Sequence, residues 1–175
     1  GLALARGRYI KPMDGDDILL PWASRYLLKA MADTKAGAAL SGGEHQPTYL
    51  PSETRAEEIV SLPEPPEKSV EALALLPRSL RRAQASPSHW MFEAALLPRI
   101  GGSDPGVFIQ DYSLELEIAL ATKVAIRQEP MLMIPAAAPG RGDRAAVLLE
   151  MPRIHEPAGL RLRTLRRLRS LPHHG

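Results

Sequence analysis

The stretch DYSLELEIALATKVAIRQ, residues 111–128, decides how the rest of the chain is interpreted. Large apolar side chains alternate with polar or small ones through most of it. The even positions read Leu114, Leu116, Ile118, Leu120, Thr122, Val124 and Ile126. On a helix these side chains would point in all directions, whereas on a strand they share one face. Leu, Ala and Glu favour helices, and a helix over 112–127 is the alternative, but the alternation predicts a strand.

Two later apolar segments would complete a sheet with this strand. They are MLMI at 131–134 and AAVLLEM at 145–151, joined by a Gly-containing turn. A small sheet with one apolar face needs a cover. A predicted helix over 86–99, which carries Trp90 and Phe92, would cover part of it, and another subunit would cover the rest.

The residues before 101 predict helices separated by proline-rich connectors. We expect a helix over about 17–35, a linker over 37–52 and a stiff connector at 62–68 (LPEPPEK). A helix over 69–84 would be kinked or split by Pro77. The predicted class is therefore α+β, irregular and partly extended, with a small antiparallel sheet over about 112–151.

The predicted organisation has four parts. They are a basic N-terminal arm (1–16), helical segments with Pro-rich linkers (17–100), a small β region (101–151) and an Arg-rich tail (152–175). The Arg-rich, acid-poor opening is typical of an organellar presequence, and an ordinary basic arm is the alternative. The longest run without a charged residue, 130–140, is 11 residues, whereas a membrane-spanning helix needs about 20.

Composition and charge predict a chain that relies on partners. Among its 175 residues are 17 prolines, no cysteine, and only 5% aromatic residues, so the expected core is thin. Residues 152–175 hold six Arg against one acid, a net charge of +5, while the other 151 residues carry −3. On a helix, the leucines of the tail favour one side and most of its arginines the other. Such a helix can bind a partner protein, RNA or an anionic membrane surface.

No local motif predicts catalysis, a metal site or a cofactor. The acids of MDGDD, residues 13–17, resemble the start of a calcium loop but continue as ILLPW. They are interpreted as acids at a helix start. His89 is interpreted as a half-buried residue at the start of a helix. The chain has no GxSxG, GxxxxGK[ST] or HExxH sequence, and the prediction is that it is not an enzyme.

The predicted function is that of a non-catalytic accessory subunit of a large mitochondrial assembly, a respiratory-chain complex or ATP synthase, on the matrix side or peripheral to the inner membrane. One alternative is a mitochondrial ribosomal protein whose tail contacts rRNA; another is a small enzyme without a recognisable motif. Partners would be other protein subunits, with anionic lipid head groups or rRNA as further partners of the tail. The predicted partner-binding residues are Trp22, Tyr26, Trp90, Phe92, Arg161, Arg163, Arg166, Arg167 and Arg169.

Overall fold

The structure, a computed structural model, describes residues 2–15, 17–41, 56–102, 104, 106, 110–133 and 156–170. Its centre is a five-stranded mixed sheet in the order β1-β5-β3-β6-β4. The strands are β1 (Tyr9–Ile10), β3 (Ala38–Ser41), β4 (Glu71–Leu73), β5 (Trp90–Glu93) and β6 (Val124–Arg127). β3 and β6 pair in parallel, and the other neighbours pair antiparallel. The α+β class predicted from the sequence is confirmed.

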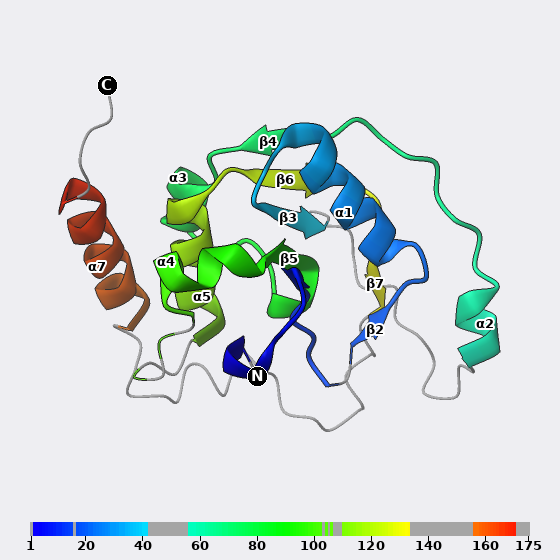
Figure 1. The fold of residues 1–175 in the computed structure, drawn as a ribbon, viewed down its shortest axis with the longest axis horizontal. Coiled ribbons are helices and arrows are strands. Elements are labelled where there is room, and N and C mark those ends of the chain that lie inside the picture. The colour runs from blue at the N-terminus through cyan, green and yellow to red at the C-terminus, as the bar shows by residue number, and fades with distance from the viewer. Residues whose placement is uncertain are drawn as a thin grey trace.

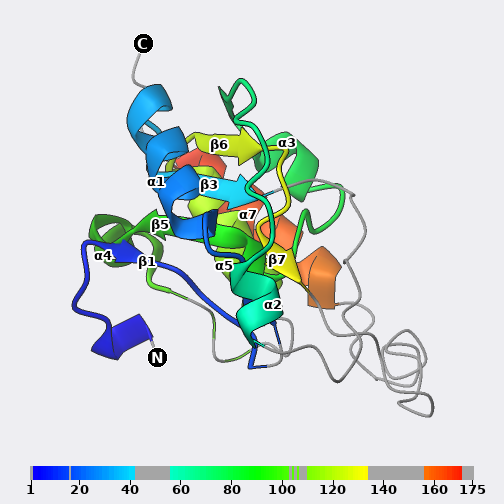
Figure 2. The same cartoon turned by 90° about the vertical axis from the view of Figure 1, so that its right-hand side faces the viewer.

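Helices lie on both faces of this sheet (Figures 1 and 2). The longer ones are α1 (Ala23–Thr34), α5 (Gln110–Ala121) and α7 (Glu156–Ser170). Short turns of helix are η1 (Leu2–Leu4), α2 (Ala56–Val60), α3 (Leu76–Ser79), η2 (Pro87–His89), η3 (Ala94–Leu96) and α4 (Leu97–Ile100). In Figure 1, α2 and α7 lie at opposite ends of the molecule.

The central strands alternate between two hydrophobic clusters, as the two-residue period of a strand requires. Ala39, Met91 and Ala125 pack with α1 through Leu27, Ala30 and Met31. Their sequence neighbours, including Leu40 and Phe92, pack on the other face with α5. Because β3 and β6 present the small side chains Ala39 and Ala125 to α1, the helix can pack closely on these two strands.

A close approach also ties α1 to the loop that precedes β6. After α1 the chain turns at Lys35, whose φ is 56°, and reaches Gly37. The Gly37 N–H donates to the Thr122 hydroxyl at 3.0 Å. A β-carbon at position 37 would lie 2.8 Å from that oxygen, so glycine is needed there.

A second, two-stranded sheet pairs β2 (Ile18–Leu19) with β7 (Leu132–Met133). It covers a cluster built on Trp22 and Tyr26, which are 5% and 2% exposed. The Trp22 indole donates to the Pro130 carbonyl at 2.9 Å, and the Tyr26 hydroxyl donates to the Pro65 carbonyl at 2.7 Å. The strand at 132–133 lies within the predicted segment 131–134, but it pairs with β2 and not, as predicted, with residues 112–127.

The strand predicted from Leu114 to Ile126 is wrong over most of its length. Residues 110–121 form α5, and only 124–127 form a strand. α5 is buried on nearly every side, by the sheet, α3, α4 and α7, so apolar residues occur all round it and no stripe at helical spacing is visible. Because α5 can carry apolar residues on every side, the alternation of even and odd positions does not mark a strand. The predicted strand at 145–151 lies outside the described residues.

Two further elements differ from the sequence prediction. Trp90–Glu93, predicted as helix, is β5, paired with β1 on one side and β3 on the other. Its aromatic residues suit a strand buried on both faces. The start of the predicted linker, Ala38–Ser41, is the fully buried strand β3. The predicted helix over 69–84 is instead β4 followed by the single turn α3 with Pro77 in its first turn.

A buried ion pair lies at the end of β6. Arg127, the last residue of β6, and Glu129 are each 1% exposed and lie 2.8 Å apart. Glu129 also accepts the Lys68 N–H at 2.6 Å and the Gln128 N–H at 3.1 Å. The Arg127 guanidinium stacks over the Tyr26 ring, 4.6 Å from its centroid.

Breaking this pair from one side should destabilise the protein strongly. We expect Arg127→Met to lower the free energy of unfolding by about 3–5 kcal/mol, because Glu129 is left buried without its counter-charge. The double variant R127M/E129L should recover most of that loss. Arg25→Met, in the exposed pair with Glu64, is the control and should cost under about 1 kcal/mol. Urea unfolding measures all three; an Arg127→Met loss as small as that of Arg25→Met would contradict the role of the pair.

Candidate functional site

The candidate site lies where the carboxyl ends of β1, β3 and β6, three strands that run in the same direction, come together. We call this end of the sheet the carboxyl edge. β1 and β3 are both antiparallel to β5, and β6 is parallel to β3, so the carboxyl ends of β1, β3 and β6 share one edge. Ligands of α/β proteins bind at this edge. The chain places Lys11 and Asp14 directly after β1, and Ser41 at the end of β3.

The segment after β1 is fastened to the segment before β5. The Asp14 N–H donates to the Ser88 hydroxyl at 2.8 Å, and the Lys11 ammonium donates to the Ser88 carbonyl. Ser41 Oγ donates to the His89 carbonyl at 3.3 Å. Three segments that are distant in sequence therefore meet around Ser88 and His89.

The charges at this edge act on one another. Burial, opposed by the carboxylates of Asp17 and Asp14, lowers the pKa of Lys11 to about 8. Burial and the positive charge of Lys11 lower the pKa of His89. His89 Nδ1 and the Ser86 hydroxyl are 3.0 Å apart. The imidazole therefore favours its neutral form near pH 7.

Asp111, in the first turn of α5, belongs to the same electrostatic neighbourhood. Burial and the negative charge of Asp14 raise the pKa of Asp111, although solvent still reaches its side chain. Asp14 and Asp111 are 97 positions apart in the sequence. A carboxylate with a raised pKa beside another carboxylate is typical of sites that bind cations or move protons.

A metal ion could bind at this site only together with the phosphates of a substrate. Within the residues that the structure describes, no group of three or more His, Cys, Asp or Glu side chains is placed to hold a metal ion. Mg²⁺, however, commonly binds through one or two carboxylates together with substrate phosphates. Among the described residues neither Asp14 nor Asp17 forms an ion pair, so both carboxylates are available.

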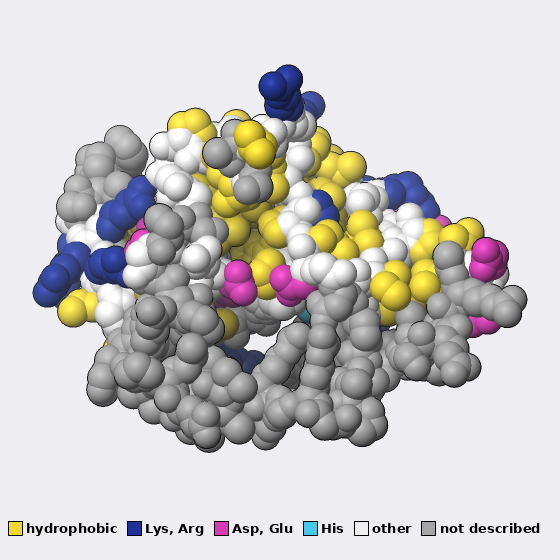
Figure 3. Space-filling model, turned by 90° about the horizontal axis from the view of Figure 1, so that it is seen from below, with side chains coloured by type: hydrophobic (Ala, Val, Ile, Leu, Met, Phe, Trp, Pro, Cys, Tyr) yellow, Lys and Arg dark blue, Asp and Glu magenta, His cyan; other side chains and the backbone are white. Residues whose placement is uncertain are grey.

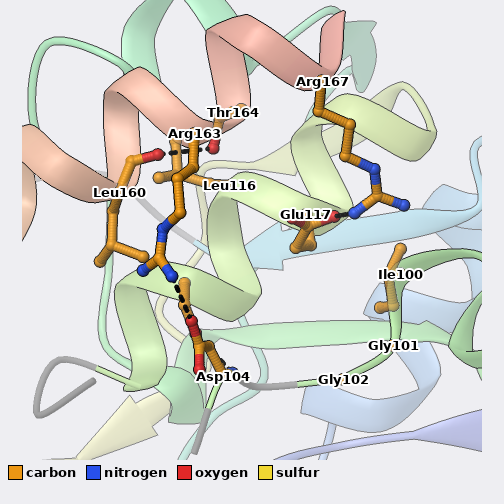
Figure 4. A pocket seen from close by; sticks show the side chains of 11 residues that line it. Ile100, Gly101, Gly102, Asp104, Leu116, Glu117, Leu160, Arg163, Thr164 and Arg167 are labelled. Carbon is orange, nitrogen blue, oxygen red and sulfur yellow. Dashed lines mark hydrogen bonds and ion pairs between the residues drawn. The ribbon is translucent and has the colours of Figure 1, made fainter. Parts of the chain in front are cut away.

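Away from the carboxyl edge, a cavity of about 270 Å³ lies between α4, α5 and α7 (Figure 4). Two arginines of α7 border it: Arg163 pairs with Asp104 at 3.0 Å, and Arg167 pairs with Glu117. Leu160 and Thr164 of the same helix are buried beside them. These contacts hold α7 against α5.

The sequence-predicted site residues are in two places. Trp22, Tyr26, Trp90 and Phe92 are buried within the chain, 5% exposed or less, and their role in partner binding stays a prediction. Arg161, Arg163, Arg166, Arg167 and Arg169 all lie on α7. Arg161 Nε donates to the Tyr112 hydroxyl at 2.8 Å.

The sequence analysis missed the carboxyl-edge site. MDGDD was interpreted as the start of a helix, but α1 begins at Ala23 and the acids follow strand β1. The signal that could have found the site is an acidic run directly after a short apolar segment. Asp111 carried no local signal, because its partner Asp14 is brought near it only by the fold.

Comparison with solved structures identifies the fold. The chain is similar to S. aureus TarS residues 1–349 in complex with UDP-GlcNAc, with a TM-score of 0.64 and 14% identity over 94% of this chain and 44% of that one. A second structure of TarS 1–349 gives a TM-score of 0.54 and 14% identity over 77% and 37%. A structure titled S. aureus TarS gives 0.53 and 14% over 98% and 30%. The chain thus spans less than half the length of each neighbour.

No family model and no curated protein matches the chain. The likeness to TarS corrects the functional prediction: the fold is not that expected of an accessory subunit of a respiratory complex or ATP synthase, and a mitochondrial association has no support. The prediction that the chain is not an enzyme is also contradicted, since the shared fold is one that binds a nucleotide sugar in TarS. The alternative of a small enzyme without a recognisable motif agrees better.

The electrostatic coupling at the carboxyl edge can be tested on Lys11. Because the Asp14 carboxylate raises the pKa of Lys11 against the effect of burial, we expect Asp14→Asn to move that pKa from about 8 to a lower value. Carbon-13 NMR of labelled lysine Cε atoms measures it. Asp33→Asn, on α1, is the matched control and should leave Lys11 unchanged.

The same shift has a consequence for stability. The folded-state pKa of Lys11 lies below its ordinary value of 10.5, so the unfolded chain binds more protons between the two values. The contribution of Lys11 to the free energy of unfolding should therefore fall as the pH decreases from about 10.5 to about 8, and it should stay level below pH 8. Lys11→Met should lack this slope in thermal melts. A Lys11 pKa near 10.5 in the folded wild-type protein would contradict the proposed burial.

Proposed function

We propose that this chain belongs to a glycosyltransferase that uses a nucleoside diphosphate sugar as donor. The observation that carries the proposal is the fold similar to that of TarS, in which Asp14 follows β1 at the carboxyl edge and its charge acts on Asp111 of α5. One of the TarS structures contains UDP-GlcNAc, and 94% of this chain is covered by that match. Because the chain spans less than half of that neighbour, the whole reaction stays a proposal.

The acidic segment after β1 suits the diphosphate of such a donor only with a counter-cation. Asp14 and Asp17 would repel a diphosphate by themselves, and Lys11 supplies a single positive charge beside them. A divalent cation would satisfy both sides, with the two carboxylates as its protein ligands and the phosphates as the others. The chemistry that such a cation supplies is neutralisation of charge on the departing diphosphate.

Asp111 suits the role of general base. Its raised pKa makes the carboxylate a better proton acceptor than an ordinary aspartate. Solvent reaches the side chain, so an acceptor hydroxyl can reach it too. In the transfer, a bond forms between the acceptor oxygen and the anomeric carbon, and the bond from that carbon to the phosphate oxygen breaks. The hydroxyl proton passes to Asp111, and the nucleoside diphosphate leaves.

Donor binding tests the first part of this proposal. We expect UDP with Mn²⁺ or Mg²⁺ to raise the melting temperature of the protein, and Asp14→Asn to remove most of that rise because a cation ligand is lost. Asp33→Asn, an exposed aspartate on α1, should retain it. Isothermal titration calorimetry with UDP, with and without the cation, gives the affinities. Equal binding of UDP by wild type and Asp14→Asn, or no binding by wild type, would refute the donor site.

The proton-transfer role of Asp111 has a separate readout. Asp111→Asn should lower the rate of sugar transfer or of donor hydrolysis about 10²–10⁴-fold, the usual contribution of general base catalysis. UDP affinity should change little, since Asp111 is not assigned to the diphosphate. Release of UDP from UDP-GlcNAc, followed by a coupled assay, measures the rate. A variant that keeps its rate, or that loses UDP affinity instead, would exclude this assignment.

A further inference from the structure

α7 is a basic helix with two different sides. It contains five arginines and one glutamate. Toward the body of the protein, Leu160 is 5% exposed and Thr164 is 4% exposed. The ion pairs of Arg163 with Asp104 and of Arg167 with Glu117 lie on either edge of this inner side (Figure 4). Arg161 also forms hydrogen bonds within the chain. Three of the five arginines are thus engaged within the chain.

The opposite side of α7 combines positive charge with exposed leucines. Positions 162, 165, 166 and 169 follow the i, i+3, i+4, i+7 spacing that puts them on one face. Leu162 is 50% exposed, and Leu165 and Leu168 are each 40% exposed. Within the described residues, Arg166 and Arg169 form no ion pair or hydrogen bond. We call Leu162, Leu165, Arg166 and Arg169 the outer face of α7.

Exposed leucines are concentrated on this helix. Of the large hydrophobic side chains that the described residues expose, three lie on α7, and Leu4, Met13, Val60 and Leu62 are spread over other segments. Figure 3 shows Lys and Arg side chains gathered at the left end of the molecule, the end at which α7 lies in Figure 1, with hydrophobic side chains beside them. Leucines held in water at this density need a partner that covers them.

We infer that the outer face of α7 binds the surface of a lipid bilayer that contains anionic phospholipids. A helix that lies in the bilayer interface places leucines among the acyl chains and arginines at the lipid phosphates. The outer face offers both, and its two free arginines complement the negative charge of such lipids. Within the described part of the chain, no helix is long and apolar enough to cross a membrane.

This surface fits a membrane better than it fits RNA. RNA-binding surfaces stack bases on aromatic side chains, and α7 has none. Phosphate contacts to RNA would use Arg166 and Arg169 but would leave the leucines in water. A bilayer takes up both kinds of side chain at once. The inference does not depend on the proposed enzymatic function, because α7 and the carboxyl-edge site share no residue.

Vesicle flotation with the full chain tests the inference. We expect binding to vesicles of phosphatidylcholine mixed with phosphatidylglycerol, and much weaker binding to phosphatidylcholine alone. R166Q/R169Q should weaken binding to the anionic vesicles about 30-fold, from about fivefold per arginine near a charged surface. L162S/L165S should weaken it at least about tenfold, because buried leucine area is lost. High salt should weaken binding by the wild-type protein.

The matched control is R6Q/K35Q, which removes two exposed positive charges on other segments and should retain wild-type binding. All the substituted side chains are exposed, so circular dichroism and melting temperatures should be unchanged, which separates loss of binding from loss of folding. Equal loss in R6Q/K35Q would mean that net charge alone acts and would overturn the inference. It would also be overturned by equal binding to neutral vesicles, or by binding to an RNA duplex with none to vesicles.

Discussion

The parallel pairing of β3 with β6 is the interaction on which the rest of the structure depends. It joins Ala38–Ser41 to Val124–Arg127, residues more than eighty positions apart. Parallel strands need a long crossover and cover on both faces. Here α1 supplies one cover directly before the loop to β3, and α5 supplies the other directly before β6. The contact of Gly37 with Thr122 fixes the two entry loops side by side.

The candidate site is a consequence of that pairing. Once β1, β3 and β6 run in the same direction, their carboxyl ends share an edge, and the polar residues that follow them have to meet there. Burial and the negative charge of Asp14 then raise the pKa of Asp111, although the two residues are far apart in the sequence. The buried pair of Arg127 and Glu129 lies at the same end of β6 and holds the Lys68 backbone and the Tyr26 ring beside it. The candidate site and the buried ion pair therefore both depend on the pairing of β3 with β6.

α7 contributes differently. Its inner side is held by two ion pairs that are partly exposed, and such pairs each contribute about 1 kcal/mol or less. Leu160 adds the apolar contact to α5. The helix is thus attached to the body at modest strength, while Leu162, Leu165 and two of its arginines face outward. The outer face of α7 therefore stays exposed although the helix is attached to the body.

The sequence by itself determined the α+β class, a helix in the tail, the strand at 132–133 and the separation of a basic tail from a weakly acidic body. These follow from local composition and spacing. It did not determine the direction or the order of the strands. The alanines of β3 looked like a linker because small residues bury little area on their own, and their value appears only when α1 packs on them.

The same reason explains α5 and the site. A helix surrounded by protein has no polar side, so DYSLELEIALATKVAIRQ carried no helical stripe and its chance alternation predicted a strand. MDGDD and Asp111 were each unremarkable as local sequence. Only the tertiary structure decided that the charge of Asp14 acts on Asp111. The site is defined by which strands of the mixed sheet run parallel, and strand pairing across eighty residues leaves no trace in the local sequence.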